Sequence, residues 1–156
     1  MRPGGHGSAD GGGGRVLAVD WGSKRIGLAL SDPTRLIAQP LLTLTRRPNH
    51  RPPVAAIATL AARHEVAHIV VGLPLDEEGE EGEAARQARA LGEALAGRCG
   101  VGVTYRDERF STVTALRAAR SAGVKDRASR ARLDQMAAVA ILQGYLDAAR
   151  AGAGAA

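Results

Sequence analysis

Residues 15–32 read RVLAVDWGSKRIGLALSD, and this stretch decides the fold. Residues 16–19 are all apolar, which is typical of a strand buried on both faces. Residues 21–24 (WGSK) predict a turn, after which Ile26, Leu28 and Leu30 resume an apolar alternation and predict a second strand. Asp20 closes the first strand, where a carboxylate costs free energy unless a metal ion or a cation compensates it. Asp20 is therefore the first candidate functional residue.

Length and composition limit the class of protein. A chain of 156 residues is long enough for one domain with a real core but too short for two large lobes. Its hydrophobic content of 45% and charged content of 24% are those of a globular protein, and no apolar run is long enough to span a membrane. Cys99 is the single cysteine, which excludes an internal disulfide and fits a reducing compartment. With no signal-peptide pattern at the N-terminus, we expect a cytoplasmic protein.

The charge of the chain points to a polyanionic partner. The formal net charge is +5 and the pI about 10.3. The glycine-rich ends, residues 1–14 and 151–156, bury little apolar surface and are predicted to be disordered tails around one domain, residues 15–150. Arg2 and Asp10 cancel, so the positive excess lies within the domain, and nucleic acid is the first candidate partner. The four histidines show no metal-ligand spacing.

The remaining patterns predict alternating strands and helices. Strands are expected at 38–45, 67–72 and 101–105, with Pro40 indicating an edge position for the first of these. Helices are expected at 54–64, 83–96, from a Ser111 cap to about 120, and from about Arg132 to Arg150, with a basic connector over 121–130. An antiparallel meander followed by βα units implies an α/β fold, a mixed five-stranded sheet flanked by helices.

Three carboxylates could meet at one edge of this sheet. Glu108 follows the 101–105 strand at the edge where Asp20 ends its own strand, if the two strands run parallel. Asp134 lies in the first turn of the last predicted helix, on the apolar face that packs on the sheet. Each acid alone has a plainer role: a turn acceptor, a surface ion pair or a helix-start carboxylate. Together they would repel one another unless cations lie between them, which favours Mg²⁺ or Mn²⁺ and phosphodiester chemistry. Strand alternation leaves Asp107 and Glu108 as competing candidates for the second position.

Four blocks, in order, cover most of residues 15–147: VLAVDWGSKRIGLALSD (16–32), IVVGLPL (69–75), YRDERFST (105–112) and LDQMAAVAILQGYL (133–146). On these blocks the chain resembles the YqgF/RuvX family, described as pre-16S rRNA nucleases and Holliday-junction resolvase-like proteins. The resemblance implies an RNase H-like fold and a divalent-metal nuclease whose catalytic and metal-binding acids are Asp20, Glu108 and Asp134. It thereby favours Glu108 over Asp107. Two features depart from the family pattern: Gln135, where a small residue is common, and the Gly-rich residues 1–14.

The expected reaction is hydrolysis of a phosphodiester bond in structured nucleic acid, in the 5′ region of precursor 16S rRNA, with two Mg²⁺ or Mn²⁺ ions held by the three acids. The candidate phosphate contacts are Lys24, Arg25, Arg109, Lys125, Arg127 and Arg132. One alternative is a resolvase of branched DNA, which requires a symmetric dimer. Another is a non-catalytic RNA-binding factor in ribosome assembly or transcription. We expect a monomer or a weak homodimer with no membrane partner.

Overall fold

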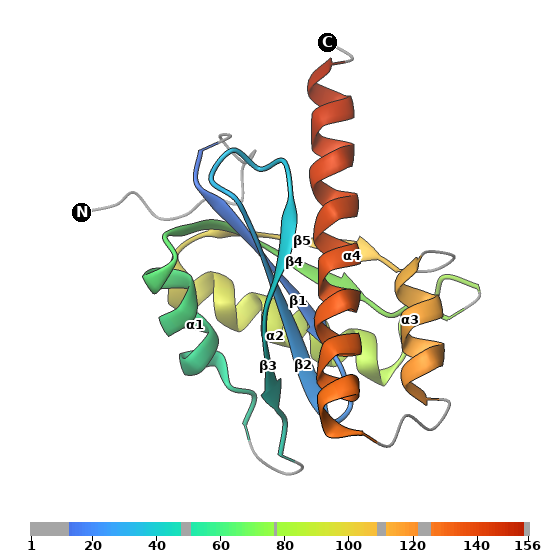
Figure 1. Cartoon of the computed structure of the whole chain (residues 1–156). Helices are drawn as coiled ribbons and strands as arrows, with labels where there is room; N and C mark the ends of the chain where they lie inside the picture. The colour runs from blue at the N-terminus through green and yellow to red at the C-terminus, as the bar shows by residue number, and fades with distance from the viewer. Residues whose placement is uncertain (1–12, 48–50, 77, 109–111, 122–125, 155–156) are drawn as a thin grey trace.

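The computed structural model describes residues 13–47, 51–76, 78–108, 112–121 and 126–154, and Figure 1 shows how their helices and strands are arranged. The strands are β1 (Arg15–Trp21), β2 (Arg25–Ser31), β3 (Ala38–Thr45), β4 (Val66–Leu73) and β5 (Gly102–Asp107). The helices are α1 (Val54–Arg63), α2 (Glu83–Cys99), α3 (Thr112–Ser121) and α4 (Arg127–Gly154). The predicted N-terminal tail, residues 1–14, lies outside the described residues except for Gly13 and Gly14. Among the described residues, no helix has both the length and the apolar composition needed to cross a membrane.

The sheet has the order β3-β2-β1-β4-β5, so the opening strand is its centre. β2 is antiparallel to both β1 and β3, while β4 is parallel to β1 and β5 is parallel to β4. The predicted mixed five-stranded sheet is therefore confirmed. β3 is an edge strand, as Pro40 indicated, and the register shift in its pairing with β2 lies beside this proline.

The two faces of the sheet are covered by different helices. Leu17, Val19 and Trp21 of β1 belong to a core cluster with α1 and α2. Val16 and Ala18 belong to a second cluster, with residues of α3 and α4. Because strand side chains alternate between faces, Asp20 belongs to the second face, under α4.

Helix α4 is longer than the sequence predicted. It begins at Arg127 rather than near Arg132, so the predicted basic connector over 121–130 is wrong for residues 127–130. Asp126 is the reason: its carboxylate accepts hydrogen bonds from the backbone amide (3.1 Å) and the hydroxyl (2.8 Å) of Ser129 and so caps the helix. These hydrogen bonds lower the pKa of Asp126. Asp134 is consequently about two turns into the helix, not in its first turn. At the other end, α4 includes residues 151–154 of the predicted tail.

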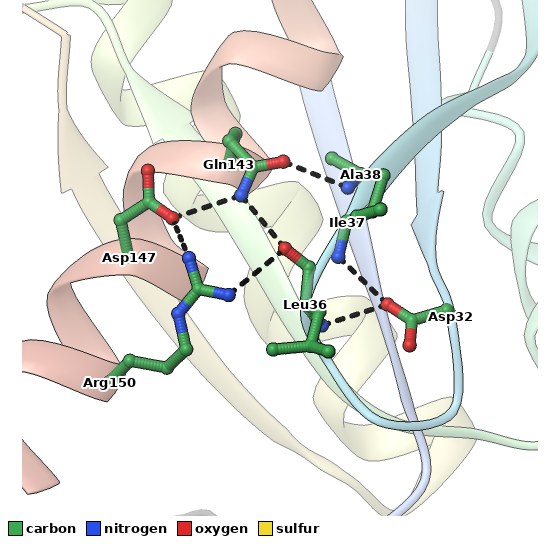
Figure 2. A network of polar contacts seen from close by, with 7 residues as sticks. All are labelled: Asp32, Leu36, Ile37, Ala38, Gln143, Asp147 and Arg150. Atoms are coloured by element: carbon green, nitrogen blue, oxygen red, sulfur yellow. Dashed lines mark hydrogen bonds and ion pairs between the residues drawn. The ribbon is translucent and has the colours of Figure 1, made fainter.

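The C-terminal half of α4 is anchored by the loop between β2 and β3 (Figure 2). Gln143 of α4 donates to the carbonyl of Leu36 (3.1 Å) and accepts from the amide of Ala38 (3.0 Å). Arg150 also donates to the Leu36 carbonyl, at 3.2 Å. Asp32 closes the loop by accepting from the Ile37 amide at 2.8 Å, and such contacts hold its pKa well below the usual range. These contacts hold the end of α4 that lies far from Asp134.

Candidate active site

One row of residues crosses the sheet at the level of Asp20. In the strand register, Asp20 pairs with Gly27 of β2, and Gly27 pairs with Thr43 of β3. On the other side, the parallel register that joins Val19 to Val71 brings Asp20 next to Gly72 of β4. Two glycines therefore flank Asp20 on the face that α4 covers, and each leaves an open space where a side chain would normally stand.

Asp134 occupies the space over Gly27. A Cβ atom at Gly27 would lie 2.1 Å from the backbone oxygen of Asp134, so only glycine permits this approach of α4. Ala137 and Ala138, one turn further along, are buried against the sheet and are small, as expected from the sequence. α4 is also tied to β3, because Thr43 donates to the carbonyl of Ala131 (2.9 Å) and accepts from Gln135 (3.2 Å). Gln135, the departure from the family pattern, thus has a role in placing this helix.

Glu108 occupies the space over Gly72. A Cβ atom at Gly72 would lie 1.6 Å from Oε1 of Glu108. The backbone of Glu108 is held on both sides, since its amide donates to the carbonyl of Leu73 (3.3 Å) and its carbonyl accepts from the hydroxyl of Thr114 (2.9 Å). Asp107 is exposed, whereas Glu108 is buried. The geometry therefore supports Glu108 as the second acid.

The three predicted acids are all buried and line up along the row. Asp20 and Asp134 are 0% exposed and Glu108 is 4% exposed. Neighbouring strands lie about 4.8 Å apart, so the positions over Gly27 and Gly72 are each about one strand spacing from Asp20. As the side chains stand, no three of the described His, Cys, Asp and Glu residues form a group arranged to hold a metal ion. The backbone of Asp134, over Gly27, and the carboxylate of Glu108, over Gly72, thus lie on opposite sides of Asp20.

Arg25 forms an ion pair with the third acid. Its Nε donates to Oδ2 of Asp134 at 2.6 Å, and 21% of the Arg25 side chain is exposed. Arg25 begins β2 and shares a face with Gly27, two residues further along, which explains how it reaches Asp134. The sequence predicts a phosphate contact for Arg25 and gives no sign of this pair.

The turn between β1 and β2 is held in place by Arg46, which the sequence analysis did not single out. The Arg46 guanidinium lies 4.0 Å from the centre of the Trp21 ring and donates to the carbonyl of Gly22 at 3.1 Å. Gln87 of α2 accepts from both Trp21 (3.3 Å) and Arg46 (3.0 Å). Lys24 projects from this fixed turn and is exposed.

Two of the other predicted phosphate contacts, Arg127 and Arg132, lie in the same region. Arg127 and Arg132 are exposed on the first turns of α4, which lies beside the β1–β2 turn in Figure 1. Arg109 and Lys125 lie outside the described residues. The structure thus brings Lys24, Arg127 and Arg132 to the end of the molecule where Asp134 lies.

Gly27 and Gly72 shape the site but are not among the residues predicted for it. Both are single glycines inside apolar strand patterns, IGLAL and IVVGL. An isolated glycine in a strand often marks a close approach of another backbone or side chain. That signal was available, and it points to the two positions that flank Asp20.

Comparisons with known proteins show which proteins this chain is similar to. Residues 14–148 match the RuvX family, which is described as Holliday junction resolvase. A protein from Myxococcus xanthus named "Putative pre-16S rRNA nuclease" is 46% identical over 136 residues, 87% of this chain and 89% of the relative. A protein of the same name from Kineococcus radiotolerans is 47% identical over 137 residues, 87% of this chain and 73% of the relative.

Among solved structures, RuvC from Thermus thermophilus is similar, with a TM-score of 0.54 and 17% sequence identity over 88% of this chain and 96% of that one. At this level of identity the likeness concerns the fold. The fold is RNase H-like, as the family resemblance implied.

Proposed function

The chain belongs to the RuvX family, and from this membership we propose that it is a divalent-metal-dependent nuclease that processes the 5′ end of precursor 16S rRNA in the cytoplasm. The observation that carries the proposal is the row of three buried carboxylates, Asp20, Glu108 and Asp134. Buried carboxylates are costly in a protein unless cations compensate them. Three buried acids lower the stability of the fold, and metal-assisted phosphodiester hydrolysis explains why they are present.

The three acids fit a divalent metal in the chemistry of their donor atoms. Carboxylate oxygens are the ligands that Mg²⁺ and Mn²⁺ prefer in proteins. Gly27 and Gly72 leave room for Asp134 and Glu108 on either side of Asp20, so these three acids are the residues that would hold the metal. When bound, two such ions supply a hydroxide nucleophile and stabilise the leaving oxygen.

In the proposed reaction the protein's own residues hold and orient the substrate. Asp20 is held at the centre of the row by β1, the central strand of the sheet. Lys24, Arg127 and Arg132 are exposed near the start of α4 and would contact substrate phosphates, as we also propose for Arg25, Arg109 and Lys125. The fixed turn would place the backbone of Lys24 so that its ammonium group can reach a substrate phosphate.

The test compares the full-length wild-type chain with Asp20→Asn on precursor 16S rRNA, in Mg²⁺ and in Mn²⁺. We expect the variant to lose cleavage by at least about a hundredfold, because its amide cannot replace a carboxylate ligand. It should keep its fold, as judged by circular dichroism, and most of its RNA affinity. Glu93→Gln, which removes an exposed carboxylate from α2 on the opposite face of the sheet, is the charge control and should cleave normally. Cleavage by Asp20→Asn at the wild-type rate would overturn the proposal.

A second candidate substrate is a four-way DNA junction, which the description of the matched family favours. The same experiment therefore includes a synthetic junction as substrate. Paired nicks on opposite strands, made by a salt-stable dimer, would identify a resolvase. Cleavage of the RNA alone, by a monomer or weak homodimer, would identify the rRNA nuclease. RNA binding that is indifferent to metal, without any cleavage, would identify a non-catalytic assembly or transcription factor.

A further inference from the structure

The ion pair between Arg25 and Asp134 lies within the row of acids and has a role of its own. The two residues are 109 positions apart in the chain, and the pair joins the first residue of β2 to the third turn of α4. The carboxylate of Asp134 is completely buried, while the Arg25 side chain keeps 21% of its surface exposed. The arginine can therefore leave toward solvent, but the acid cannot.

A buried carboxylate is costly unless hydrogen bonds or a positive charge compensate it. In this structure Arg25 supplies a compensating charge through a charge-assisted hydrogen bond of 2.6 Å to Oδ2. A divalent ion shared by Asp20 and Asp134 would need an oxygen of the same carboxylate. It would also lie close to the guanidinium, where two positive groups repel each other strongly because water is largely excluded.

We propose that Arg25 competes with divalent metal for Asp134: its guanidinium is the counter-ion of the acid in the metal-free protein and leaves Oδ2 when metal binds. This inference rests on the proposed metal-dependent function. It adds that a side chain of the protein itself competes with the metal for a carboxylate ligand. Arg25 thereby stabilises the fold before metal arrives and weakens the affinity for metal. Its release would also make the guanidinium available to a substrate phosphate, the contact predicted for it from the sequence.

Three variants of the chain, together with Asp20→Asn, test the competition without any nucleic acid. Arg25→Gln removes the charge but keeps a hydrogen-bond donor, and Arg25→Lys keeps the charge. Arg98→Gln removes one exposed positive charge from the end of α2 and is the control for net charge. The dissociation constant for Mn²⁺ is measured directly by electron paramagnetic resonance of the free ion, and Tm is measured with and without Mn²⁺.

We expect Arg25→Gln to bind Mn²⁺ about tenfold more tightly than wild type, since a nearby positive charge no longer opposes the ion. Its metal-free Tm should fall, and the rise in Tm on adding Mn²⁺ should be larger than in wild type. Arg25→Lys and Arg98→Gln should bind Mn²⁺ much like the wild type.

Two other results would separate the claims. If Arg25→Gln binds Mn²⁺ as wild type does, or more weakly, while Asp20→Asn loses binding, the competition is wrong and the metal site stands. If wild type itself shows no saturable Mn²⁺ binding that depends on Asp20, the proposed metal-dependent function fails, and the inference fails with it.

Discussion

On the face of the sheet that α1 and α2 cover, β1 contributes Leu17, Val19 and Trp21, and the neighbouring strands add large side chains. On the face that α4 covers, the same strand contributes Val16, Ala18 and Asp20. Asp20 is flanked by glycines on both neighbouring strands. The first face has the side chains of an ordinary hydrophobic core. On the second face, Gly27 and Gly72 have no side chains. This leaves room beside Asp20 for Asp134 of α4 and for Glu108, which follows β5.

Alternate residues of β1 therefore have different roles: one set stabilises the fold, and the other includes the central acid of the candidate site. Substitutions on the two faces should separate accordingly. Ranked by the loss of stability, large residues of the α1–α2 face come first, the glycines second and the acids last. Ranked by the loss of activity, the order should reverse.

Leu17→Ala should have the largest effect on stability. Leu17 is fully buried in the core under α1 and α2, so the substitution removes buried surface and leaves a cavity. We expect the free energy of unfolding, measured by urea denaturation, to fall by about 2–5 kcal/mol. Cleavage per folded molecule, assayed well below Tm, should stay close to that of wild type. A variant that is stable but inactive would mean that the two faces do not act separately.

Gly27→Ala should be less destabilising but more harmful to activity. The new methyl group would meet the backbone oxygen of Asp134 at 2.1 Å, so α4 must shift away from the sheet. Overpacking of this kind costs about 1–3 kcal/mol, and the displaced acid should lower cleavage severely. Gly97→Ala on α2 is the matched control, because nothing lies within 4 Å of its added Cβ atom. Equal activity of the two alanine variants would contradict the role given to the close approach.

Much of the fold could be predicted because its signals are local. Continuous apolar runs and apolar alternation located all five strands within a few residues, and Pro40 placed β3 at the edge. The start of α4 was missed because its first turns carry Arg127, Arg130 and Arg132. Such a basic stretch is typical of a solvated connector. Because Asp126 caps the helix, however, these residues are helical.

The site could be predicted only in part, because its geometry depends on long-range packing. Strand alternation shows that Asp107 and Glu108 point to opposite faces of the sheet. It does not show which face carries the site, so it could not decide between them. The contact of Arg25 with Asp134 joins residues 109 positions apart and leaves no local trace in the sequence. Gly27 and Gly72 did leave one, as isolated glycines in strands, but their partners became evident only from the packing of α4 and Glu108.

The most direct measurement of the central claim uses two neighbouring acids. Glu108→Gln and Asp107→Asn each remove one negative charge, one from a buried carboxylate over Gly72 and the other from an exposed carboxylate. The rate of metal-dependent cleavage of precursor 16S rRNA is compared for both variants, with Tm as the measure of folding. We predict that Glu108→Gln loses cleavage by at least about a hundredfold with little change in Tm, while Asp107→Asn cleaves like the wild type. Normal cleavage by Glu108→Gln, or an equal loss in both variants, would contradict the account.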